Sequence, residues 1–256
     1  MTAVTPTLAT DSVSVDGGGL ESEVWAALAT VVDPELDQPI TDLGFVRSIR
    51  IDDVGVTVHL RLPTSFCAPN FAYLMASDAQ DALLRVLGVG RVRVFLDDHH
   101  DSAKINAGLA LNAGYRGTFG QEAEESLDEL RRTFQVKAHT AAMERCVMAL
   151  LKSTGRTVEE THGLTLGELP GGLHKEALLR RRTDVGLGIS PDDLVLVDDD
   201  GVPVPPEAAP MRLRFARAVR VSVEGNAHFC RGLLATRYDD AGEGLTTHIT
   251  NTRRAS

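Results

Sequence analysis

A cysteine flanked by prolines marks the stretch of this sequence that is best suited to chemistry. Cys67 lies in the segment Pro-Thr-Ser-Phe-Cys-Ala-Pro-Asn, residues 63–70. The alternating residues 56–62 before it predict a strand, and apolar residues at helical spacing after it predict a helix. A helix N-terminus carries partial positive charge, which favours a thiolate over a thiol. Metal binding and sulfur transfer both require a thiolate, whereas the alternative for a free cysteine is a small buried hydrophobe.

A run of acidic residues and histidines provides further candidate ligands. Residues 97–101, Asp-Asp-His-His-Asp, are of the types that bind iron or zinc. Neighbouring side chains of an extended chain point to opposite sides, so the whole run cannot converge on one ion. His99 or His100, with one aspartate, could join Cys67 if the preceding strand ends beside the cysteine loop. The alternative is a solvated loop.

Two more cysteines have different expected roles. His228 and Cys230 are two residues apart, so on a strand their side chains would face the same way. This pair could form half of a metal site that Cys67 completes, across a domain boundary or a dimer interface. The alternative is a half-buried strand with incidental polar residues. Cys146 lies on the apolar face of a predicted helix, and we expect it in the core.

An acidic loop and a threonine complete the candidate site. Asp33 and Glu35 belong to the loop Asp-Pro-Glu-Leu-Asp, residues 33–37, and could bind metal or transfer protons. Loop capping is an equally good interpretation, because Asp bonds readily to its own backbone. Thr64 is expected to support the cysteine loop through a hydroxyl bond to the backbone. Gly44 is expected to adopt a backbone shape that a side chain would block.

The hydrophobic pattern predicts an α/β (α+β) scaffold for these residues. The first 19 residues are a predicted disordered tail. Residues 20–100 read helix, strand, strand, helix, strand, with helices on a three-stranded sheet. A mixed α/β C-terminal extension follows. This extension is predicted to comprise a connector (101–125), a helical and β region (126–240) and a flexible tail (241–256). The helical and β region is expected to contain a helix from Ser126, a hairpin near 194–204 and an arginine-bearing strand over 212–223.

Composition excludes several classes of function. The net charge of −10 opposes binding to nucleic acid or to an anionic membrane surface. No apolar run approaches the ~20 residues needed to span a bilayer. The first residues lack the basic start and the apolar block of a signal peptide. The three cysteines are widely spaced, which fits a reducing compartment better than a disulfide framework. We therefore expect a cytoplasmic protein. No phosphate-binding or hydrolase motif is present, and we predict no enzyme of those kinds.

Four pieces of the sequence together resemble a known family. Asp33-Pro34-Glu35, Leu43-Gly44-Phe45-Val46, Thr64 and Cys67 resemble the iron–sulfur cluster assembly domain of the SufT and PaaD type, over about residues 20–97. The resemblance implies that family's small α/β fold and a role in maturing iron–sulfur proteins. It also implies a reactive cysteine at Cys67 and an acidic loop at Asp33 and Glu35. In one departure, Ala68 stands where the family commonly has proline, directly after the cysteine.

We therefore predict an accessory protein for metallocentre assembly rather than an enzyme. The Cys67 thiolate would hold iron or an iron–sulfur cluster transiently and deliver it to a client apo-metalloenzyme, an iron–sulfur protein or a di-iron oxygenase. A homodimer is one arrangement left open. The alternative is a metal-free scaffold or chaperone-like protein that binds the client. A third hypothesis is a metal-dependent enzyme built from His99 or His100 with His228 and Cys230.

Overall fold

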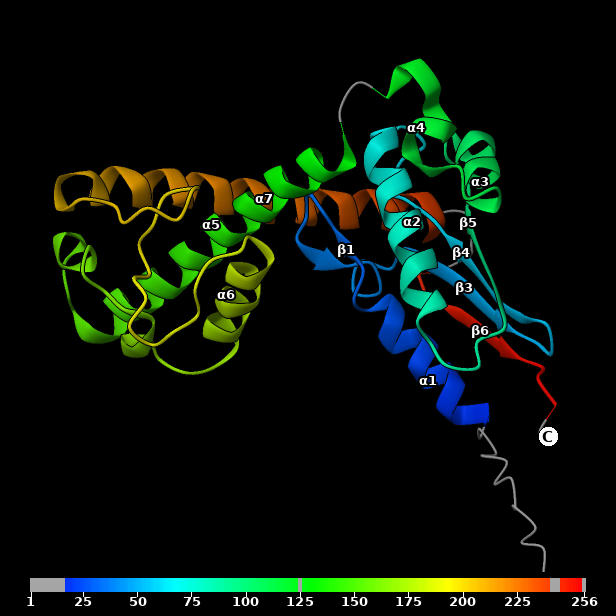
Figure 1. Cartoon of the computed structure of the whole chain (residues 1–256), viewed down its shortest axis with the longest axis horizontal. Helices are drawn as coiled ribbons and strands as arrows, with labels where there is room; N and C mark the ends of the chain where they lie inside the picture. The colour runs from blue at the N-terminus through cyan, green and yellow to red at the C-terminus, as the bar shows by residue number, and fades with distance from the viewer. Residues whose placement is uncertain (1–16, 124–125, 240–244, 255–256) are drawn as a thin grey trace, which may run out of the picture.

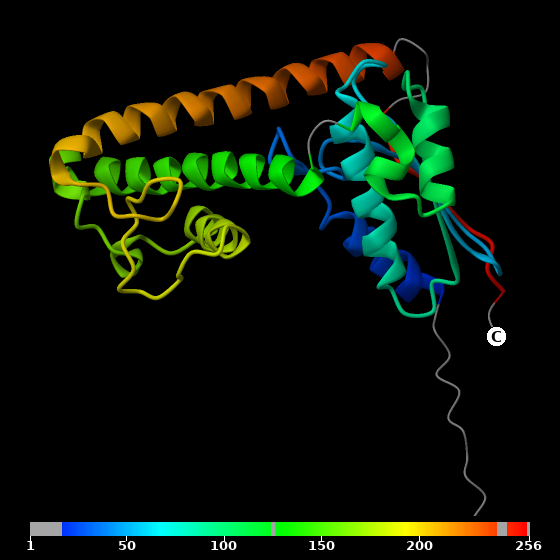
Figure 2. The ribbon, with the colours of Figure 1, turned by 45° about the horizontal axis from the view of Figure 1, so that its top comes forward.

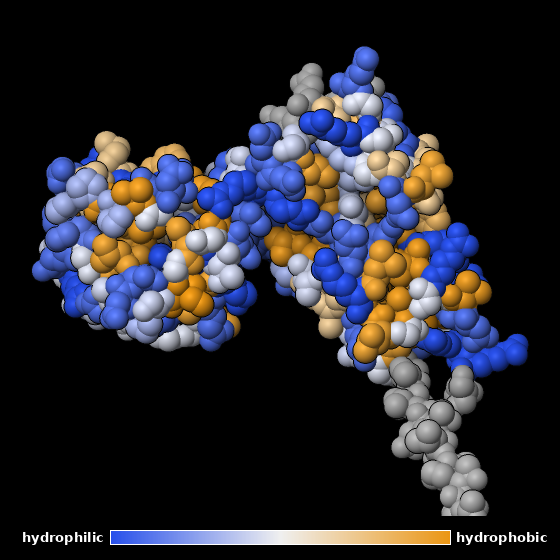
Figure 3. Space-filling view, viewed as in Figure 1, coloured by the Kyte–Doolittle hydropathy of each residue, from blue (hydrophilic) through white to orange (hydrophobic). Residues whose placement is uncertain are grey.

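The computed structural model describes residues 17–123, 126–239 and 245–254. It shows an α/β lobe formed mainly by the N-terminal half and a helical lobe beside it, with two long helices running between them (Figure 1). The mixed α/β fold class is confirmed. The narrow waist between the lobes is covered mostly by hydrophilic residues on the face seen in Figure 3.

The α/β lobe has the predicted element order. Its main elements are α1 (Gly17–Leu28), β3 (Val46–Ile51), β4 (Gly55–Leu60), α2 (Pro69–Leu84) and β5 (Arg91–Leu96). β3 and β4 pair antiparallel across a tight turn, and β4 and β5 pair parallel because α2 crosses over between them. α1 and α2 pack together, and α2 packs against β5. The prediction of two helices on this sheet is therefore confirmed.

The sheet has a fourth strand that we did not predict. β6 (His248–Asn251) pairs parallel with β3, giving the order β5-β4-β3-β6. The expectation of a flexible tail over 241–256 is wrong for this segment, and residues 241–244 and 255–256 lie outside the described residues. β3 would otherwise be a sheet edge with unpaired backbone groups, and the strand-forming His-Ile-Thr-Asn segment satisfies them.

Two other segments near the ends of the α/β lobe differ from the prediction. α1 begins at Gly17, inside the predicted tail, and residues 1–16 lie outside the described part of the chain. The expected connector forms α3 (Ser102–Ala110), α4 (Gly114–Phe119) and a 3-10 turn (Gly120–Glu122). Its apolar residues bury themselves in the same core as the sheet, and this tertiary packing outweighs their weak helical period.

The helical lobe is built around α5 (Leu127–Thr154), with α6 (Leu173–Asp184) and α7 (Ala209–Asp239) packed against it. The start of α5 is as predicted, because the Ser126 side chain accepts a hydrogen bond from the backbone N–H of Glu129. 3-10 turns at Val158–Thr161, Leu166–Glu168 and Pro206–Ala208 connect these helices. None of the described helices combines the length and the apolar character needed to cross a bilayer.

The predicted strand over 212–223 is wrong, because the segment is part of α7. Val219, Val221 and Val223 alternate in the manner of a strand. The buried residues instead recur every three to seven positions and form one helical face. They are Leu213, Ala216, Val223, Ala227, Leu234 and Tyr238. The predicted hairpin near 194–204 is reduced to isolated bridges, between Val197 and Pro203 and between Thr165 and Leu194.

α7 belongs to both lobes. Its first half packs on α5 in the helical lobe, and its second half contributes Ala227, Leu234 and Tyr238 to the core of the α/β lobe. Figure 2 shows the helix running along one edge of the molecule from one lobe to the other. Through this helix the C-terminal half of the chain reaches the predicted cysteine site.

Candidate functional site

Cys67 lies where the sequence predicted it, on the loop between β4 and α2. α2 begins at Pro69, with Ala68 as its extended N-cap residue, so the cysteine precedes the first helical turn by two residues. The side chain is half-buried and packs against the core of the α/β lobe. The cysteine is therefore partly exposed at the start of α2, where Pro69 has no N–H group and the Phe71 N–H donates to Asn70 Oδ1 at 2.9 Å.

The cysteine loop is held by hydrogen bonds from its own residues and from α7. The Phe66 N–H donates to Thr64 Oγ1 at 3.2 Å, and this hydroxyl lies 3.5 Å from Cys67 Sγ. Arg237 of α7 donates to the Leu62 carbonyl oxygen at 3.0 Å and to Ser65 Oγ at 3.0 Å. Thr64 thus contacts both the loop backbone and the sulfur.

His99 is placed as a structural residue rather than a ligand. It is buried, and its Nε2–H donates to the Cys67 carbonyl oxygen at 2.8 Å. Its Nδ1 accepts a hydrogen bond from the Asp101 N–H at 3.1 Å, so both ring nitrogens are occupied. The expectation of a metal-ligating His99 does not fit this geometry, because a ligand needs a free nitrogen. His100 is exposed and stacks on Phe66 instead.

The two aspartates before the histidines are also paired. Arg47 Nη1 lies 3.1 Å from Asp97 Oδ2 and 3.3 Å from Asp98 Oδ2. His59 Nδ1 lies 2.9 Å from Asp97 Oδ1. The run that looked like a metal motif therefore closes the end of the sheet through ion pairs and hydrogen bonds.

The acidic loop lies in a small hairpin formed by β1 (Val32–Asp33) and β2 (Gln38–Pro39). Asp33 is buried, and its Oδ1 accepts hydrogen bonds from the N–H groups of Glu35 at 2.9 Å and Leu36 at 2.8 Å. Burial raises the pKa of Asp33 to about 6, although these two bonds lower it in part. Loop capping is thus present, at a carboxylate that is unusually buried.

Cys230 of α7 is near both loops. It is half-buried and packs on the same core as Cys67. Burial raises the pKa of the Cys230 thiol to about 11, and the negative charges of Asp33, Cys67 and Glu35 raise it further. Hydrogen bonds fix α7 against the hairpin, from Asn226 Nδ2 to Glu35 Oε1 at 3.1 Å and from Arg231 to Gln38. The cysteine loop, the acidic hairpin and α7 therefore converge at one place.

His228 does not join this site. Residues two apart on an α-helix point about 200° apart, so His228 and Cys230 face different ways. His228 is exposed, whereas Cys230 faces the α/β lobe. The prediction that they form a same-sided pair is wrong, because it assumed a strand. Cys146 is buried on α5 as expected, and burial raises the pKa of its thiol to about 11.

Across the described ranges, no three His, Cys, Asp or Glu side chains lie close enough to hold a metal ion. The two thiols and the acidic loop offer an incomplete donor set. The supporting residues Asn226, Arg231 and Arg237 were missed from the sequence, because the His228–Cys230 pair was considered on a strand and not on one long helix. A helical period over 209–239 was the signal that could have found them.

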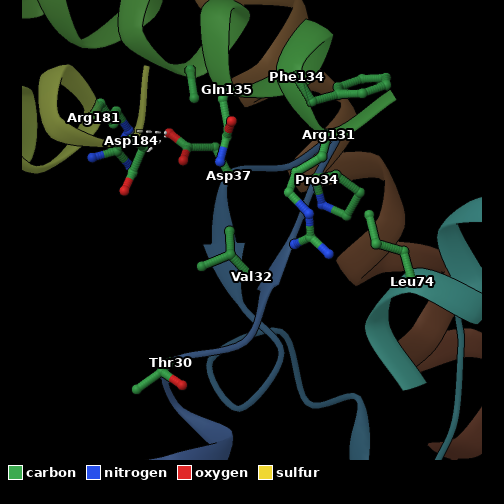
Figure 4. A pocket seen from close by; sticks show the side chains of 11 residues that line it. Thr30, Val32, Pro34, Asp37, Leu74, Arg131, Phe134, Gln135, Arg181 and Asp184 are labelled. Atoms are coloured by element: carbon green, nitrogen blue, oxygen red, sulfur yellow. Dashed lines mark hydrogen bonds and ion pairs between the residues drawn. The ribbon is translucent and has the colours of Figure 1, made fainter. Parts of the chain in front are cut away.

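A separate cavity lies between the acidic hairpin and the helical lobe (Figure 4). Its volume is about 210 Å³, and α5 and α6 supply much of its lining. Arg181 Nη2 lies 2.6 Å from Asp37 Oδ2, and Arg131 makes a two-pronged pair with Asp78 at 2.7 and 2.8 Å. Because both guanidinium charges are compensated, this cavity lacks the free positive charge of an anion site. No cysteine lines it.

Comparison with known proteins agrees with the geometry. A family model described as iron–sulfur cluster assembly protein matches residues 21–94. Iron–sulfur cluster carrier proteins of Mycobacterium tuberculosis and Mycobacterium leprae are 26% identical over 163 residues and 28% identical over 162 residues, respectively. The matches cover 64% and 63% of this chain but 41% and 40% of those proteins, so the chain spans less than half of their length.

A shorter relative matches the α/β lobe. An uncharacterized protein of Methanocaldococcus jannaschii is 33% identical over 87 residues, which are 34% of this chain and 90% of that protein. No solved structure matches. The matched residues 21–94 contain the acidic hairpin, the Cys67 loop and α2. Through this N-terminal lobe the chain belongs to the iron–sulfur cluster assembly protein family.

Proposed function

We propose that this protein holds iron or an iron–sulfur cluster transiently and passes it to a client apo-metalloenzyme, with Cys67 and Cys230 as the thiolate ligands. The observation that supports this most is the approach of Cys230, from the C-terminal helix, to the Cys67 loop and the acidic hairpin. Iron and its clusters prefer thiolate sulfur, and two thiols are too few to close a coordination shell. An incomplete shell suits cargo that must leave again.

The high pKa of Cys230 provides a means of release. A thiol with a pKa of about 11 is protonated at neutral pH, so cargo must displace its proton to gain the second sulfur. Loading would release this proton, and departure of the cargo would let Cys230 take a proton back. The cargo is then held more weakly than by two ionised thiolates, which favours transfer.

The acidic hairpin would attract positively charged iron. Asp33 uses Oδ1 for the two backbone N–H groups, and its Oδ2 accepts no hydrogen bond from the described residues. Glu35 is held beside it through Asn226.

Because binding of iron by Cys67 and Cys230 needs reduced thiols, we also propose a cytoplasmic location.

Anaerobic reconstitution with ferrous iron and sulfide tests the proposal. The wild type should bind sub-stoichiometric iron and show thiolate-to-iron absorption. Cys67→Ala and Cys230→Ala should each lose most of it, while Cys146→Ala, which removes a buried thiol of the other lobe, should retain it. Iron binding that survives both of the first two substitutions would refute the ligand assignment.

Transfer is tested separately from binding. Loaded protein is mixed with an apo-ferredoxin as the acceptor, and the circular dichroism of the ferredoxin cluster is followed with time. The wild type should complete the acceptor faster than free iron and sulfide at equal concentration. No acceleration would mean that any bound iron is not delivered.

One observation favours a second candidate function, a metal-free scaffold for the client. Both ring nitrogens of His99 are hydrogen-bonded to backbone atoms of the cysteine loop and of Asp101, so this histidine stabilises the shape of the loop. Under this candidate the cysteine loop is a docking surface. Iron-free wild type and Cys67→Ala would then bind the client apo-enzyme with equal affinity.

A further inference from the structure

The outward face of α7 carries a second, independent feature. The helix buries one side against α5 and the α/β lobe, as described above. Over most of its length, no other helix or strand among the described residues covers the opposite side (Figure 2). A helix face that points to water normally carries charged side chains.

This face instead carries large apolar side chains with small residues between them. Met211, Phe215 and Phe229 are 66%, 52% and 65% exposed, and Val221 beside them is 54% exposed. Small exposed residues lie between the large ones, three or four positions apart. We call this stripe the α7 seam; it consists of Met211, Phe215, Ala218, Ser222, Gly225 and Phe229.

We propose that the α7 seam packs against the α7 seam of a second copy, antiparallel, with the two-fold axis near Ser222. A two-fold interface must be self-complementary, so residue i meets j and j meets i. Phe215 and Phe229 each lie seven residues, about two helical turns, from Ser222. An antiparallel pair centred there places Phe215 of each copy against Phe229 of the other.

The centre of the seam fits a helix as its partner. Ala218, Ser222 and Gly225 have little or no side chain, so two helix backbones can approach to roughly 8 Å there. The aromatic rings then close the contact on both sides of the crossing. Two crossing helices can both have this arrangement, because the small side chains let the backbones approach at the crossing point and the large ones fill the space on either side of it.

The charges beside the seam favour the antiparallel direction. Arg214 and Arg217 are exposed and have no ion-pair partner among the described residues. A parallel pair in register would set each arginine against its own copy, which is repulsive. The antiparallel pair sets Arg214 level with Cys230 of the second copy and Arg217 level with Ala227, so the cations are separated.

The area involved is that of a weak but specific dimer. With ~200 Å² for a large side chain, covering Met211, Phe215 and Phe229 would remove about 370 Å² of surface per copy. The small residues, part of Val221 and the arginine stems bring this to roughly 1,000 Å² for both copies, the lower limit for a specific interface. The dimer should therefore dissociate on dilution.

Sedimentation velocity of the full chain tests the dimer. From roughly 1 to 200 µM, the wild type should shift from the monomer mass toward twice that mass, as expected for a low-area interface. Ser222→Arg places two like charges at the axis on an exposed residue and should remain monomeric throughout. Ser153→Arg, an exposed control on α5, should behave as the wild type. A wild type that is monomeric at every concentration, or a dimer that survives Ser222→Arg, would overturn the proposal.

Disulfide trapping tests the direction, in protein whose Cys67 and Cys230 are replaced by serine. Phe215→Cys and Phe229→Cys proteins are oxidised separately and as a mixture. The mixture should form far more cross-linked dimer than either protein alone, because only the antiparallel pair brings positions 215 and 229 together. Equal cross-linking of each protein with itself would indicate a parallel pair and refute the arrangement.

Discussion

The buried carboxylate of Asp33 should lower the stability of the protein at neutral pH. Its pKa is raised from 3.8 to about 6, so the folded protein binds this proton more tightly than the unfolded chain. Between these two pH values the folded state holds more protons, and the free energy of unfolding falls as the pH rises. At 1.36 kcal/mol per pKa unit, the ionised carboxylate destabilises the fold by about 3 kcal/mol at pH 7, as an upper limit.

Asp33→Asn should remove this effect. Asparagine keeps an Oδ1 that can accept the two N–H bonds of Glu35 and Leu36, but it has no charge to desolvate. We expect the variant to be more stable than the wild type by about 1–3 kcal/mol at pH 7, and by roughly half as much at pH 5. The gain should be small at pH 4 and should vanish below about pH 3, where the wild-type carboxyl is protonated in both states.

Urea unfolding followed by tryptophan fluorescence measures this change. The single tryptophan, Trp25, packs against the core of the α/β lobe and reports on the lobe that contains Asp33. Asp192→Asn is the control, because Asp192 is exposed and its replacement should change stability little. A variant that is no more stable at pH 7, or equally stabilised at pH 7 and pH 4, would refute the reasoning.

Three further predictions concern other groups. Asp33→Asn should lower the pKa of Cys230 and speed its alkylation by iodoacetamide at pH 8, as measured by peptide mass spectrometry, because a nearby negative charge is removed. Burial and neighbouring arginines lower the pKa of His139 to about 4. The neutral imidazole therefore costs no stability above pH 6.5, and about 3 kcal/mol of unfolding free energy is lost as the pH falls toward 4. His139→Gln should weaken this acid dependence, as measured by urea unfolding followed by circular dichroism. Gly44→Ala should destabilise by about 1–2 kcal/mol, measured by urea unfolding, because φ is +75° and a Cβ would lie 3.3 Å from Leu234 Cδ2.

Each of these has a matched control or a contradicting result. An unchanged alkylation rate at Cys230 would mean that Asp33 does not act on the thiol. His162→Gln, at an exposed histidine, should leave the acid dependence intact. Gly19→Ala lies in α1 with open space around a Cβ, so it should be neutral or stabilising, and equal losses at both glycines would contradict the backbone argument.

Local patterns predicted much of the α/β lobe. The order helix, strand, strand, helix, strand was readable because each element shows its own period and is bounded by turn residues. The start of α5 was readable for the same reason, since Ser126 and Glu129 are three residues apart and bond directly. The position of Cys67 followed from the strand before it and the proline after it.

Other parts of the candidate site depended on burial that no local pattern fixes. His99 and His100 are adjacent and of the same type, yet His99 is buried against the cysteine loop and His100 is exposed. The segment 212–223 contains both a strand period and a helical period, and packing on α5 decides for the helix. The separate prediction that residues 228–230 lie on a strand put His228 on the same side as Cys230, which the helix does not allow.

By itself, the sequence determined the scaffold and the chemistry of the loops: a cysteine at a helix start, an acidic turn and a glycine with positive φ. The tertiary structure alone decided that Cys230 reaches this site, that residues 248–251 extend the sheet, and that α7 leaves an apolar face uncovered. The physical reason is the distance along the chain over which each kind of interaction acts. Turns, caps and periods act over a few residues, whereas contacts between distant segments depend on the sum of burial over the whole chain.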